Sequence, residues 1–339
     1  MVQNKKIILS PLDWGLGHAT RCIPLIRKLL ENNNEVWVAG NETCRSLILE
    51  EFPNIPFLYL PGYRIQYANT ARKLPWVIGK QLLKIWKAVR HEHRWLQKAI
   101  ETYHFELVIS DNRFGFYSKK IPSIFITHQL NIQAPNRFLH RLANLLNHYY
   151  LKKFKACWIP DYDDRRLSGN LSFYEGTVPV TFIGPLSRFQ KPNQVISKEI
   201  DYLFILSGPE PQRTLLEKKI LEEFSHDAKR KVLVRGLPGE KENWVVSGFE
   251  IYNHCSLTEL QEFLSKTQWV ISRAGYSSIM DYDALNCQAV LIPTPGQTEQ
   301  VYLAQRFEAQ KRFGIAFQTQ PLRFQIEKYT INKLINNSL

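Results

Sequence analysis

Short apolar strands alternate with amphipathic helical stretches along nearly the whole chain. The first such unit is the clearest, because KKIILS is typical of a buried parallel strand, DWGLGHATR of a glycine-containing turn and CIPLIRKLLENN of an amphipathic helix. Further strands are predicted at EVWVAG, FLYLP, ELVISD and SIFITH, and helical spacing follows in residues 74–103 and 137–154. Such alternation predicts a mostly parallel, doubly wound sheet whose binding sites lie at the carboxyl ends of the strands.

The pattern stops at a polar, proline-containing stretch and then begins again. Residues 187–199, SRFQKPNQVISKE, are typical of an interdomain linker. Strand, loop and helix patterns resume from DYLFILSGPEPQ onwards, and Ser256 and Glu259 stand at capping-box spacing where one helix should begin. We therefore predict an α/β protein with two doubly wound, Rossmann-like domains facing across a cleft. The expected parts are a first domain at 1–186, the linker at 187–199, a second domain at 200–320, and a helical C-terminal segment at 321–339 that packs back on the first domain.

The charge is large and unevenly distributed. The chain has a net charge of +13, and residues 1–185 hold 25 Lys and Arg but only 14 Asp and Glu. This excess favours acidic partners, which include phosphorylated substrates, phospholipid and nucleic acid. Nucleic acid is the least favoured of these, because no known nucleic-acid-binding module is recognisable and the charge lies beside amphipathic helices.

Neither a membrane span nor a metal site is indicated. No apolar run approaches the roughly 20 residues that cross a bilayer, and the chain starts without the apolar region of a signal peptide, so a cytoplasmic location is predicted. The five cysteines are widely spaced and include no CxxC pair, which argues against a disulfide framework or a zinc site.

A first candidate site lies in the loop after the first strand. Gly15 and Gly17 allow a ligand to approach the N-terminus of the next helix, where His18 could act as a general base or bind a phosphate. A tight turn with a helix-capping histidine explains the same spacing equally well. Asp111 and His128 each end an apolar strand in the same half, so either could line the site or serve the structure.

The second half carries two more candidate loops. In ISRAGYSSIMD, Ser277 and Ser278 could cap a helix whose free N–H groups suit a diphosphate, and Asp281 could accept hydrogen bonds from a ribose diol. In LIPTPGQTEQ, the polar side chains could bind sugar hydroxyls. Each loop alone is also explained as solvated surface. The residues expected at the donor from this half are Ser207, Gly208, Arg235, Arg273, Gly275, Ser277, Ser278, Asp281, Gln297, Glu299 and Gln300.

These tracts resemble a known family. SRAGYSSIMDYDALNCQAVLIPTPGQTEQVYLAQ is similar to the donor-binding region of the bacterial N-acetylglucosaminyltransferases that complete lipid II, in glycosyltransferase family 28, and GLGHATR resembles their first glycine loop. The resemblance implies the GT-B fold and metal-independent binding of a UDP-sugar. It places His18 at the reaction centre, Arg273, Gly275 and Ser278 at the diphosphate, Asp281 at the ribose, and Glu299 and Gln300 at the donor sugar. The loop LSGPEPQRT departs from the family's second glycine loop, which usually has two glycines.

The resulting prediction is an inverting, metal-independent glycosyltransferase that needs no cofactor. It would move a sugar from a UDP-sugar to a hydroxyl of a lipid-linked or cell-envelope glycan, with His18, or otherwise Asp111, as the base. GLGHATRC is also similar to the UDP-sugar hydrolase of pseudaminic acid synthesis, so hydrolysis is the nearest alternative, and a non-catalytic sugar-nucleotide-binding protein is another. Asp161 and Asp163 match a D-x-D metal signature, but a solvated loop explains them better.

Two basic, amphipathic stretches add a membrane hypothesis. Residues 72–98 contain eight Lys and Arg and one acid, interleaved with aromatic and aliphatic residues, and residues 137–155 repeat this character. Such helices can lie on anionic bilayers, although an ordinary domain helix with solvated lysines fits as well. A peripheral location at the inner face of the cell membrane is therefore predicted.

Overall fold

The computed structural model describes residues 2–13, 16–62, 74–134, 136–191, 194, 196–240 and 245–338. The chain divides into two compact units, Met1–Leu186 and Ser187–Leu339.

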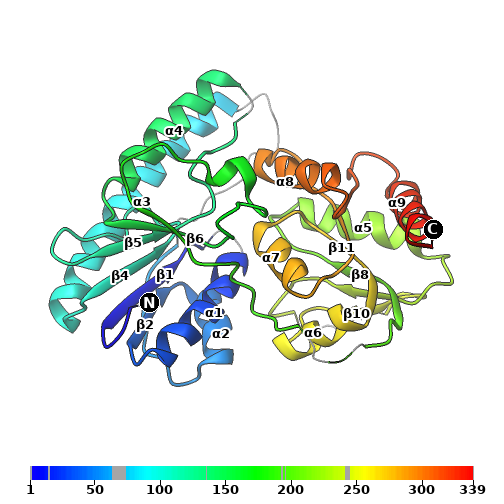
Figure 1. The fold of residues 1–339 in the computed structure, drawn as a ribbon, viewed down its shortest axis with the longest axis horizontal. Coiled ribbons are helices and arrows are strands. Elements are labelled where there is room, and N and C mark those ends of the chain that lie inside the picture. Colours follow the sequence, from blue (N-terminus) through cyan, green and yellow to red (C-terminus); the bar gives the residue numbers. More distant parts are fainter. Residues whose placement is uncertain are drawn as a thin grey trace. The chain divides into compact units, whose positions relative to one another are not determined.

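The first unit is built around a seven-stranded sheet whose neighbouring strands are all parallel, in the order β3-β2-β1-β4-β5-β6-β7 (Figure 1). Its elements are β1 (Lys6–Pro11), α1 (Leu16–Glu31), β2 (Glu35–Gly40), α2 (Glu42–Glu51), β3 (Phe57–Tyr59), α3 (Leu74–Tyr103), β4 (Leu107–Asp111), β5 (Ser123–Ile126), α4 (Arg137–Leu151), β6 (Ala156–Ile159), the short 3-10 helix η2 (Gly169–Ser172) and β7 (Val180–Phe182). The central strands β4 and β5 are buried along their whole length, as strands covered on both faces must be.

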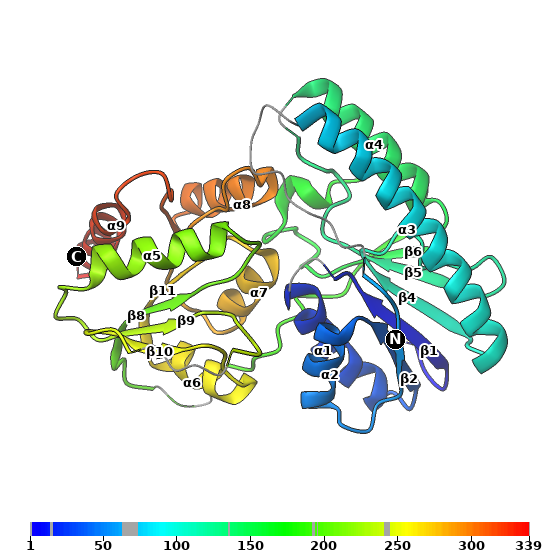
Figure 2. The ribbon, with the colours of Figure 1, turned by 180° about the vertical axis from the view of Figure 1, so that it is seen from behind.

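The second unit repeats this plan with a six-stranded parallel sheet in the order β10-β9-β8-β11-β12-β13 (Figure 2). Its elements are β8 (Ile200–Ile205), α5 (Gln212–Phe224), β9 (Lys231–Val234), β10 (Glu250–Tyr252), α6 (Leu257–Lys266), β11 (Thr267–Ser272), α7 (Tyr276–Ala284), β12 (Ala289–Leu291), α8 (Thr298–Ala309), β13 (Gly314–Ile315) and α9 (Leu322–Ser338). The predicted fold class, two doubly wound parallel sheets, is confirmed.

The C-terminal segment is helical, and the start of this helix packs in the core of the second unit. Leu322 and Ile326 of α9 are fully buried in the same apolar cluster as Phe204 of β8 and Ile220 of α5. Leu322 and Ile326 thus complete the second unit's own core, and the expected packing of residues 321–339 on the first domain stays a prediction.

In each sheet the strand order reverses beside the first strand of the unit. The chain runs outward from β1 through β2 to β3 and then returns to β4 on the other side of β1, and it does the same around β8 with β9, β10 and β11. In open parallel sheets, ligands bind at the carboxyl ends of the strands at this switch point, because the two loops there diverge to opposite faces. The fold thus points to the β1/β4 edge and the β8/β11 edge.

No helix in the part of the chain described here is both long and apolar enough to cross a membrane.

Candidate functional site

The β1/β4 switch point brings His18 and Asp111 together. Asp111 is the last residue of β4 and pairs in register with Pro11, the last residue of β1. His18 lies in the first turn of α1, the helix that follows β1. Its Nδ1 is 3.0 Å from Oδ2 of Asp111. Residues that are 93 positions apart in the sequence thus meet because two neighbouring strands end at the same edge.

Arg21 completes this cluster, and the sequence analysis did not assign it a role. It stands three residues after His18, so both side chains project from the same face of α1. Arg21 donates a hydrogen bond from Nε to Oδ2 of Asp111 at 2.9 Å and a second from Nη2 to Oδ1. Its Nη1 lies 3.4 Å from Nδ1 of His128, the other strand-end residue singled out in the sequence. The spacing of His18 and Arg21 was the signal that could have identified it.

The electrostatics keep Asp111 charged and His18 neutral. Burial alone would raise the pKa of Asp111, but the charges of Arg21 and His18 and the hydrogen bonds from both lower it to about 2. Burial and the neighbouring guanidinium of Arg21 lower the pKa of His18, while Asp111 opposes that shift. An ionised carboxylate only accepts hydrogen bonds, so Nδ1 of His18 carries the proton and Nε2 keeps a free lone pair.

Asp111 itself is sealed from solvent, with 0% of its side chain exposed, whereas 17% of the His18 side chain is exposed. Of the two candidate bases from the sequence, only His18 can reach a substrate. The described arrangement is that of an imidazole base oriented by a buried carboxylate.

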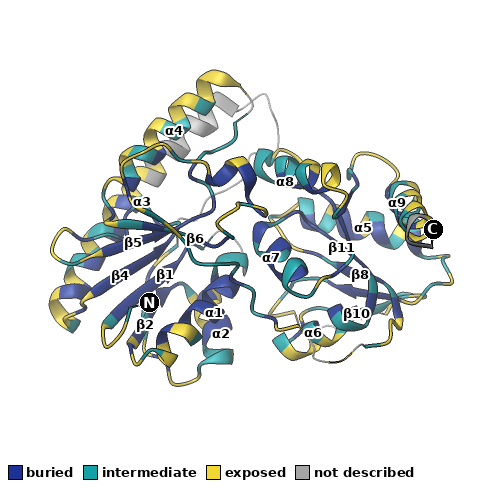
Figure 3. Ribbon diagram, in the orientation of Figure 1, coloured by how far each residue is buried: buried dark blue, intermediate teal, exposed yellow. Residues whose placement is uncertain are grey.

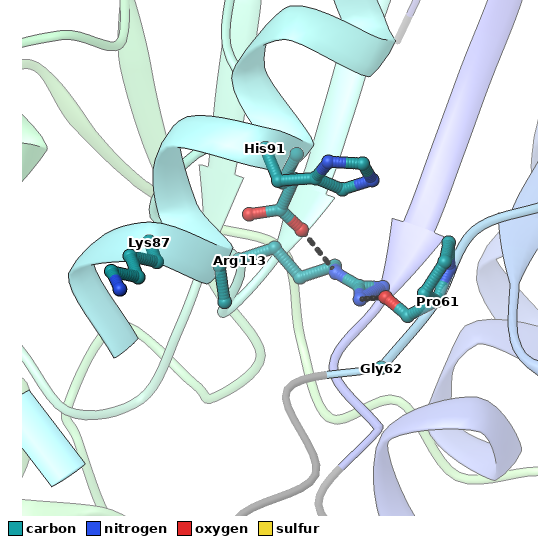
Figure 4. A pocket seen from close by; sticks show the side chains of 7 residues that line it. Pro61, Gly62, Lys87, His91 and Arg113 are labelled. Atoms are coloured by element: carbon teal, nitrogen blue, oxygen red, sulfur yellow. Dashed lines mark hydrogen bonds and ion pairs between the residues drawn. The ribbon is translucent and has the colours of Figure 1, made fainter. Parts of the chain in front are cut away.

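A small pocket of about 240 Å³ opens in the same unit, two residues beyond Asp111 (Figure 4). Its floor is Arg113, which is fully buried, forms an ion pair with Glu92 of α3 and lies 3.7 Å from Asp13. Lys87 and His91 of α3 line its rim, and Pro61 accepts a hydrogen bond from Arg113. The lining combines the cations Lys87 and Arg113 with the acid Glu92 and with the apolar Pro61 and Ala88.

At the β8/β11 switch point of the second unit, three loops meet at the carboxyl edge of adjacent strands. They follow β8, β11 and β12, and they lead into α5, α7 and α8. None of these three helices has a side-chain hydrogen bond at its N-cap. Helix N-termini attract anions because the helix dipole is positive there. The edge therefore presents three helix N-termini to a ligand, although in α5 the backbone N–H of Thr214 already donates to Glu210 at 3.2 Å.

The loop after β8 leaves room for such a ligand. Ser207 and Gly208 are both exposed. Gly208 has a φ of +100°, a conformation that residues with a side chain rarely adopt, and a Cβ built there would meet only Oγ1 of Thr294, at 3.8 Å. A glycine at this position thus serves backbone conformation and leaves the edge open.

Arg273 lies beneath these loops, immediately after β11. Its side chain is fully buried, Nη2 donates to the carbonyl of Gln212 at 2.7 Å and to Oε1 of Gln318 at 2.8 Å, and its Nε lacks a hydrogen-bond partner among the described residues. No ion pair of Arg273 with a described acid is found, and burial lowers its pKa to about 10. A buried guanidinium held only by neutral groups leaves positive charge under the three helix N-termini.

The loop after β12 is shaped by Gln300. Its Oε1 accepts a hydrogen bond from the backbone N–H of Thr294 at 2.8 Å, so this side chain holds the loop instead of projecting freely. Gln297 is the N-cap residue of α8, and Glu299 lies half-buried in the first turn. Thr294 is buried at the same place, and its Oγ1 has no hydrogen-bond partner among the described residues.

Two sequence expectations in this unit, the serine caps of α7 and the open carboxylate of Asp281, differ from the structure. Gly275, not Ser277 or Ser278, is the N-cap of α7, so both serines lie inside the first turn. Asp281 is buried and already bound, because it accepts a hydrogen bond from Ser187 at 2.8 Å and lies 3.4 Å from Nε of Arg188. Burial raises the pKa of Asp281, and Arg188 opposes the shift. A ribose contact at Asp281 would have to share these partners.

Arg235 is also engaged within the unit. Its Nε and Nη2 bind Oε1 of Glu217 at 3.0 and 2.9 Å, and Nη1 donates to Asn253 at 2.7 Å. Arg235 was expected at the donor, and in the structure it links α5 to the end of β10 through Glu217 and Asn253.

Gly15, Gly17 and Asp161 were also singled out in the sequence. Gly15 falls outside the described residues, and Gly17 lies in the first turn of α1. Asp161 is fully buried and accepts hydrogen bonds from the backbone N–H groups of Tyr162, Leu167 and Ser168. It is therefore a structural residue that closes a turn, neither a solvated side chain nor one half of an open metal pair with Asp163.

One known family matches most of the second unit, and one known protein is similar along most of the chain. Residues 203–338 match the model of the glycosyltransferase family 28 C-terminal domain. An uncharacterized glycosyltransferase of Methanosarcina acetivorans is 24% identical over 333 residues, which cover 87% of this chain and 79% of that protein.

Solved structures share the fold at low sequence identity. The glycosyltransferase of kitacinnamycin superposes with a TM-score of 0.66 at 14% identity, over 97% of this chain and 91% of that one. The calicheamicin glycosyltransferase CalG4 gives 0.64 at 13% identity, over 97% and 90%. MurG of Acinetobacter baumannii gives 0.54 at 13% identity, over 96% and 90%.

Two Rossmann-like units, each with its candidate residues at the switch point of a parallel sheet, define a protein of the GT-B fold. Most of the second, residues 203–338, matches the glycosyltransferase family 28 C-terminal domain. The chain is accordingly a glycosyltransferase.

Proposed function

We propose that this protein transfers a sugar from a UDP-sugar to an acceptor hydroxyl by a single, inverting displacement. The observation that carries the proposal is the His18–Asp111 pair at the β1/β4 switch point, with Nδ1 of His18 3.0 Å from Oδ2 of Asp111. In the first step, Nε2 of His18 removes the proton of the acceptor hydroxyl. The acceptor oxygen then bonds to the anomeric carbon while the bond from that carbon to the UDP oxygen breaks. One displacement inverts the anomeric configuration.

Asp111 acts through His18 in this mechanism. Its charge holds the imidazole in the tautomer with the proton on Nδ1 and stabilises the imidazolium that forms. Arg21 in turn keeps Asp111 ionised and fixes both of its oxygens. Orientation of this kind contributes because a base must be placed in the geometry of the transition state before the reaction begins.

The donor is assigned to the second unit. The N-termini of α5, α7 and α8 supply backbone donors for the diphosphate, and Arg273 supplies positive charge beneath them. The leaving group gains negative charge as the glycosidic bond breaks, so preorganised donors lower the barrier more than they tighten the ground state. Glu299 and Gln297, at the start of α8, are the candidates for the hydroxyls of the sugar. We assign no ribose contact to Asp281, because Ser187 and Arg188 occupy it.

The acceptor is proposed to be a lipid-linked glycan. Support comes from the excess of basic residues in the first half of the chain and from Lys87, an exposed cation at the pocket above Arg113. A phosphate that links the glycan to its lipid would be attracted to this cation.

The test is transfer of a radiolabelled sugar. The purified protein is incubated with UDP-, GDP-, TDP- and CMP-sugars in the presence or absence of a lipid extract, and label is measured in the lipid fraction and in free sugar. We expect label in the lipid fraction from a UDP-sugar only, with the inverted anomer in the product. Free sugar formed at the same rate without lipid would establish the hydrolase instead. Stabilisation by a UDP-sugar without any turnover would establish a binding protein.

A further inference from the structure

Helix α4 exposes an apolar side to solvent, which an ordinary surface helix would bury. Six large apolar residues on it are exposed, among them Phe138 at 74%, Leu145 at 68% and Tyr149 at 56%. The spacing of these three, with Leu142 between them, places them on one side of the helix. We call the six residues the α4 apolar face: Phe138, Leu139, Leu142, Leu145, Leu146 and Tyr149 (Figure 3).

The side of α4 that contacts the protein combines the polar Asn144 and Asn147 with the buried Leu151 at the end of the helix. Asn147 is buried and donates hydrogen bonds to the carbonyls of Gln129 and Leu130 at 3.1 and 3.2 Å. Asn144 both accepts from and donates to the backbone of Ile132, at 2.8 and 3.1 Å. Since amphipathic helices of globular proteins bury their apolar side, the outward direction of the α4 apolar face indicates that something else covers it.

The stretch of chain that carries this face is basic and has no acidic residue. Residues 137–155 contain five Lys and Arg and no Asp or Glu. Arg137, Arg141, Lys152 and Lys155 are exposed, and helical spacing places Arg141 and Lys152 beside the apolar residues. Lys153 lies over the ring of Tyr149, 4.4 Å from its centroid.

The neighbouring helix extends this character. Figures 1 and 2 show α3 running beside α4 in both views. On α3, Trp86 is exposed, Arg90 lies 4.5 Å from its ring centroid, and Lys84 and Lys87 are exposed as well. Tryptophan flanked by basic residues is typical of the boundary between lipid and water.

We propose that the α4 apolar face inserts into the surface of an anionic lipid bilayer, with the cations around it contacting the lipid headgroups. A second copy of this chain fits the face poorly, because a two-fold interface would set the same cations against each other. A bilayer with acidic headgroups matches both halves of the surface, since apolar side chains enter the acyl region and long basic side chains reach the phosphates.

The biological role of this membrane binding rests on the proposed function, because a bilayer would bring the enzyme to a lipid-linked acceptor. Its physical content is independent of the reaction, since vesicle binding is measured without donor or acceptor. Failure to transfer sugar would therefore leave the vesicle result standing, and failure to bind vesicles would leave transfer to a soluble acceptor open.

The test is flotation of the full-length protein with vesicles that contain about one-third phosphatidylglycerol in phosphatidylcholine. We expect binding at low salt, release at high salt and little binding to pure phosphatidylcholine. The triple variant Phe138→Ser, Leu145→Ser and Tyr149→Ser should weaken binding at least tenfold. The double variant Arg141→Gln and Lys152→Gln should weaken it about tenfold, because each cation near an anionic surface contributes up to about fivefold.

Matched controls come from the second unit. Phe324, Ile331 and Ile335 of α9 are exposed to a similar degree, and Lys218 and Lys328 are exposed cations. Serine at the first three or glutamine at the other two should leave vesicle binding unchanged. All the substituted side chains are on the surface, and circular dichroism verifies that each variant is folded.

Three results would overturn the proposal. One is absence of wild-type binding to the anionic vesicles at low salt. Another is an equal loss of binding in the α9 controls. The third is a concentration-dependent dimer, detected by sedimentation, that the triple α4 variant abolishes, because the face would then be covered by a second copy.

Discussion

At the scale of single residues, the mechanism depends on the imidazole of His18. We expect His18→Ala to reduce turnover by about 10²–10⁴-fold, the usual contribution of a general base, while the affinity for UDP changes by no more than a few fold. A base acts in the transition state and does not bind the donor in the ground state. Turnover and a UDP titration measure the two quantities. His226→Ala, which removes an exposed histidine of the second unit, is the matched control. Normal turnover in the His18 variant would remove this residue from the mechanism.

The pH dependence of the reaction follows from the same residue. Catalysis requires neutral His18, and burial together with Arg21 lowers its pKa below the ordinary value near 6.5. Activity should therefore rise with pH through a midpoint below 6.5 and be constant at neutral pH. Because Asp111 opposes this shift, Asp111→Asn should move the midpoint to still lower pH while it reduces turnover. A wild-type activity that rises with pH through a midpoint above 7 would contradict the described environment of His18.

The stability of the fold should depend on the same two groups in acid. The pKa of His18 is lower in the folded state, so the unfolded chain binds the proton more readily and stability falls as the pH drops below about 6.5. The pKa of Asp111 is lowered to about 2, so its contribution is complete above its ordinary value near 3.8 and is lost as the pH falls towards 2. Denaturant midpoints measured between pH 2 and pH 8 would show both losses.

The sequence allowed His18 and Asp111 to be named but not joined. A histidine in a glycine loop and an acid at the end of an apolar strand are each visible in one dimension, whereas the hydrogen bond between them follows from strand order. For Asp281 the local sequence pattern was misleading. Its place one turn into a helix suggested an open carboxylate, but Ser187 and Arg188 occupy it in the structure. Contacts between distant segments decide whether a polar side chain is available, and no local pattern encodes them.

At the scale of elements, Arg273 is expected to influence all three loops of the second unit. We predict that Arg273→Met weakens UDP binding about tenfold or more, since it removes positive charge and the hydrogen bond to Gln212 at the start of α5. Arg273→Lys keeps the charge and should retain part of the affinity. Isothermal titration with UDP measures both, and the thermal midpoint of the free protein reports damage to the fold. Wild-type affinity in Arg273→Met would separate this residue from the donor.

Long, strongly patterned elements were predictable, whereas two of the short strands were not. Ser256 and Glu259 form the full capping box that their spacing indicated. The strands β7 and β13, which have three and two residues, passed unnoticed because so few residues show no periodicity. Helix α4 was expected to be amphipathic, but its direction was not predictable. Periodicity identifies an apolar side, whereas only the hydrogen bonds of Asn144 and Asn147 show which side faces the protein.

At the scale of the whole molecule, two units with the same plan have specialised differently. The first holds a buried ionic cluster around a base, and the second holds helix N-termini over a buried guanidinium. Because the strand order reverses beside the first strand in each sheet, both clusters occupy equivalent positions of their units. The alternation of strands and helices in the sequence was enough to predict this plan, since it depends on connectivity and not on detailed packing.

The whole reaction depends on how the leaving diphosphate is stabilised. A leaving diphosphate needs positive charge, and the proposed sources are the N-termini of α5, α7 and α8 and the guanidinium of Arg273. Transfer should therefore persist in EDTA and gain little from added Mn²⁺ or Mg²⁺. Asp161, the first acid of the D-x-D sequence, is committed to three backbone N–H groups, so metal binding there would cost the turn that it closes. The measurement is the initial rate of transfer with EDTA, with EDTA followed by excess metal, and with neither. Loss of transfer in EDTA and its return with Mn²⁺ would show that a metal stabilises the leaving group, and the assignment of that role to the helix N-termini would be wrong.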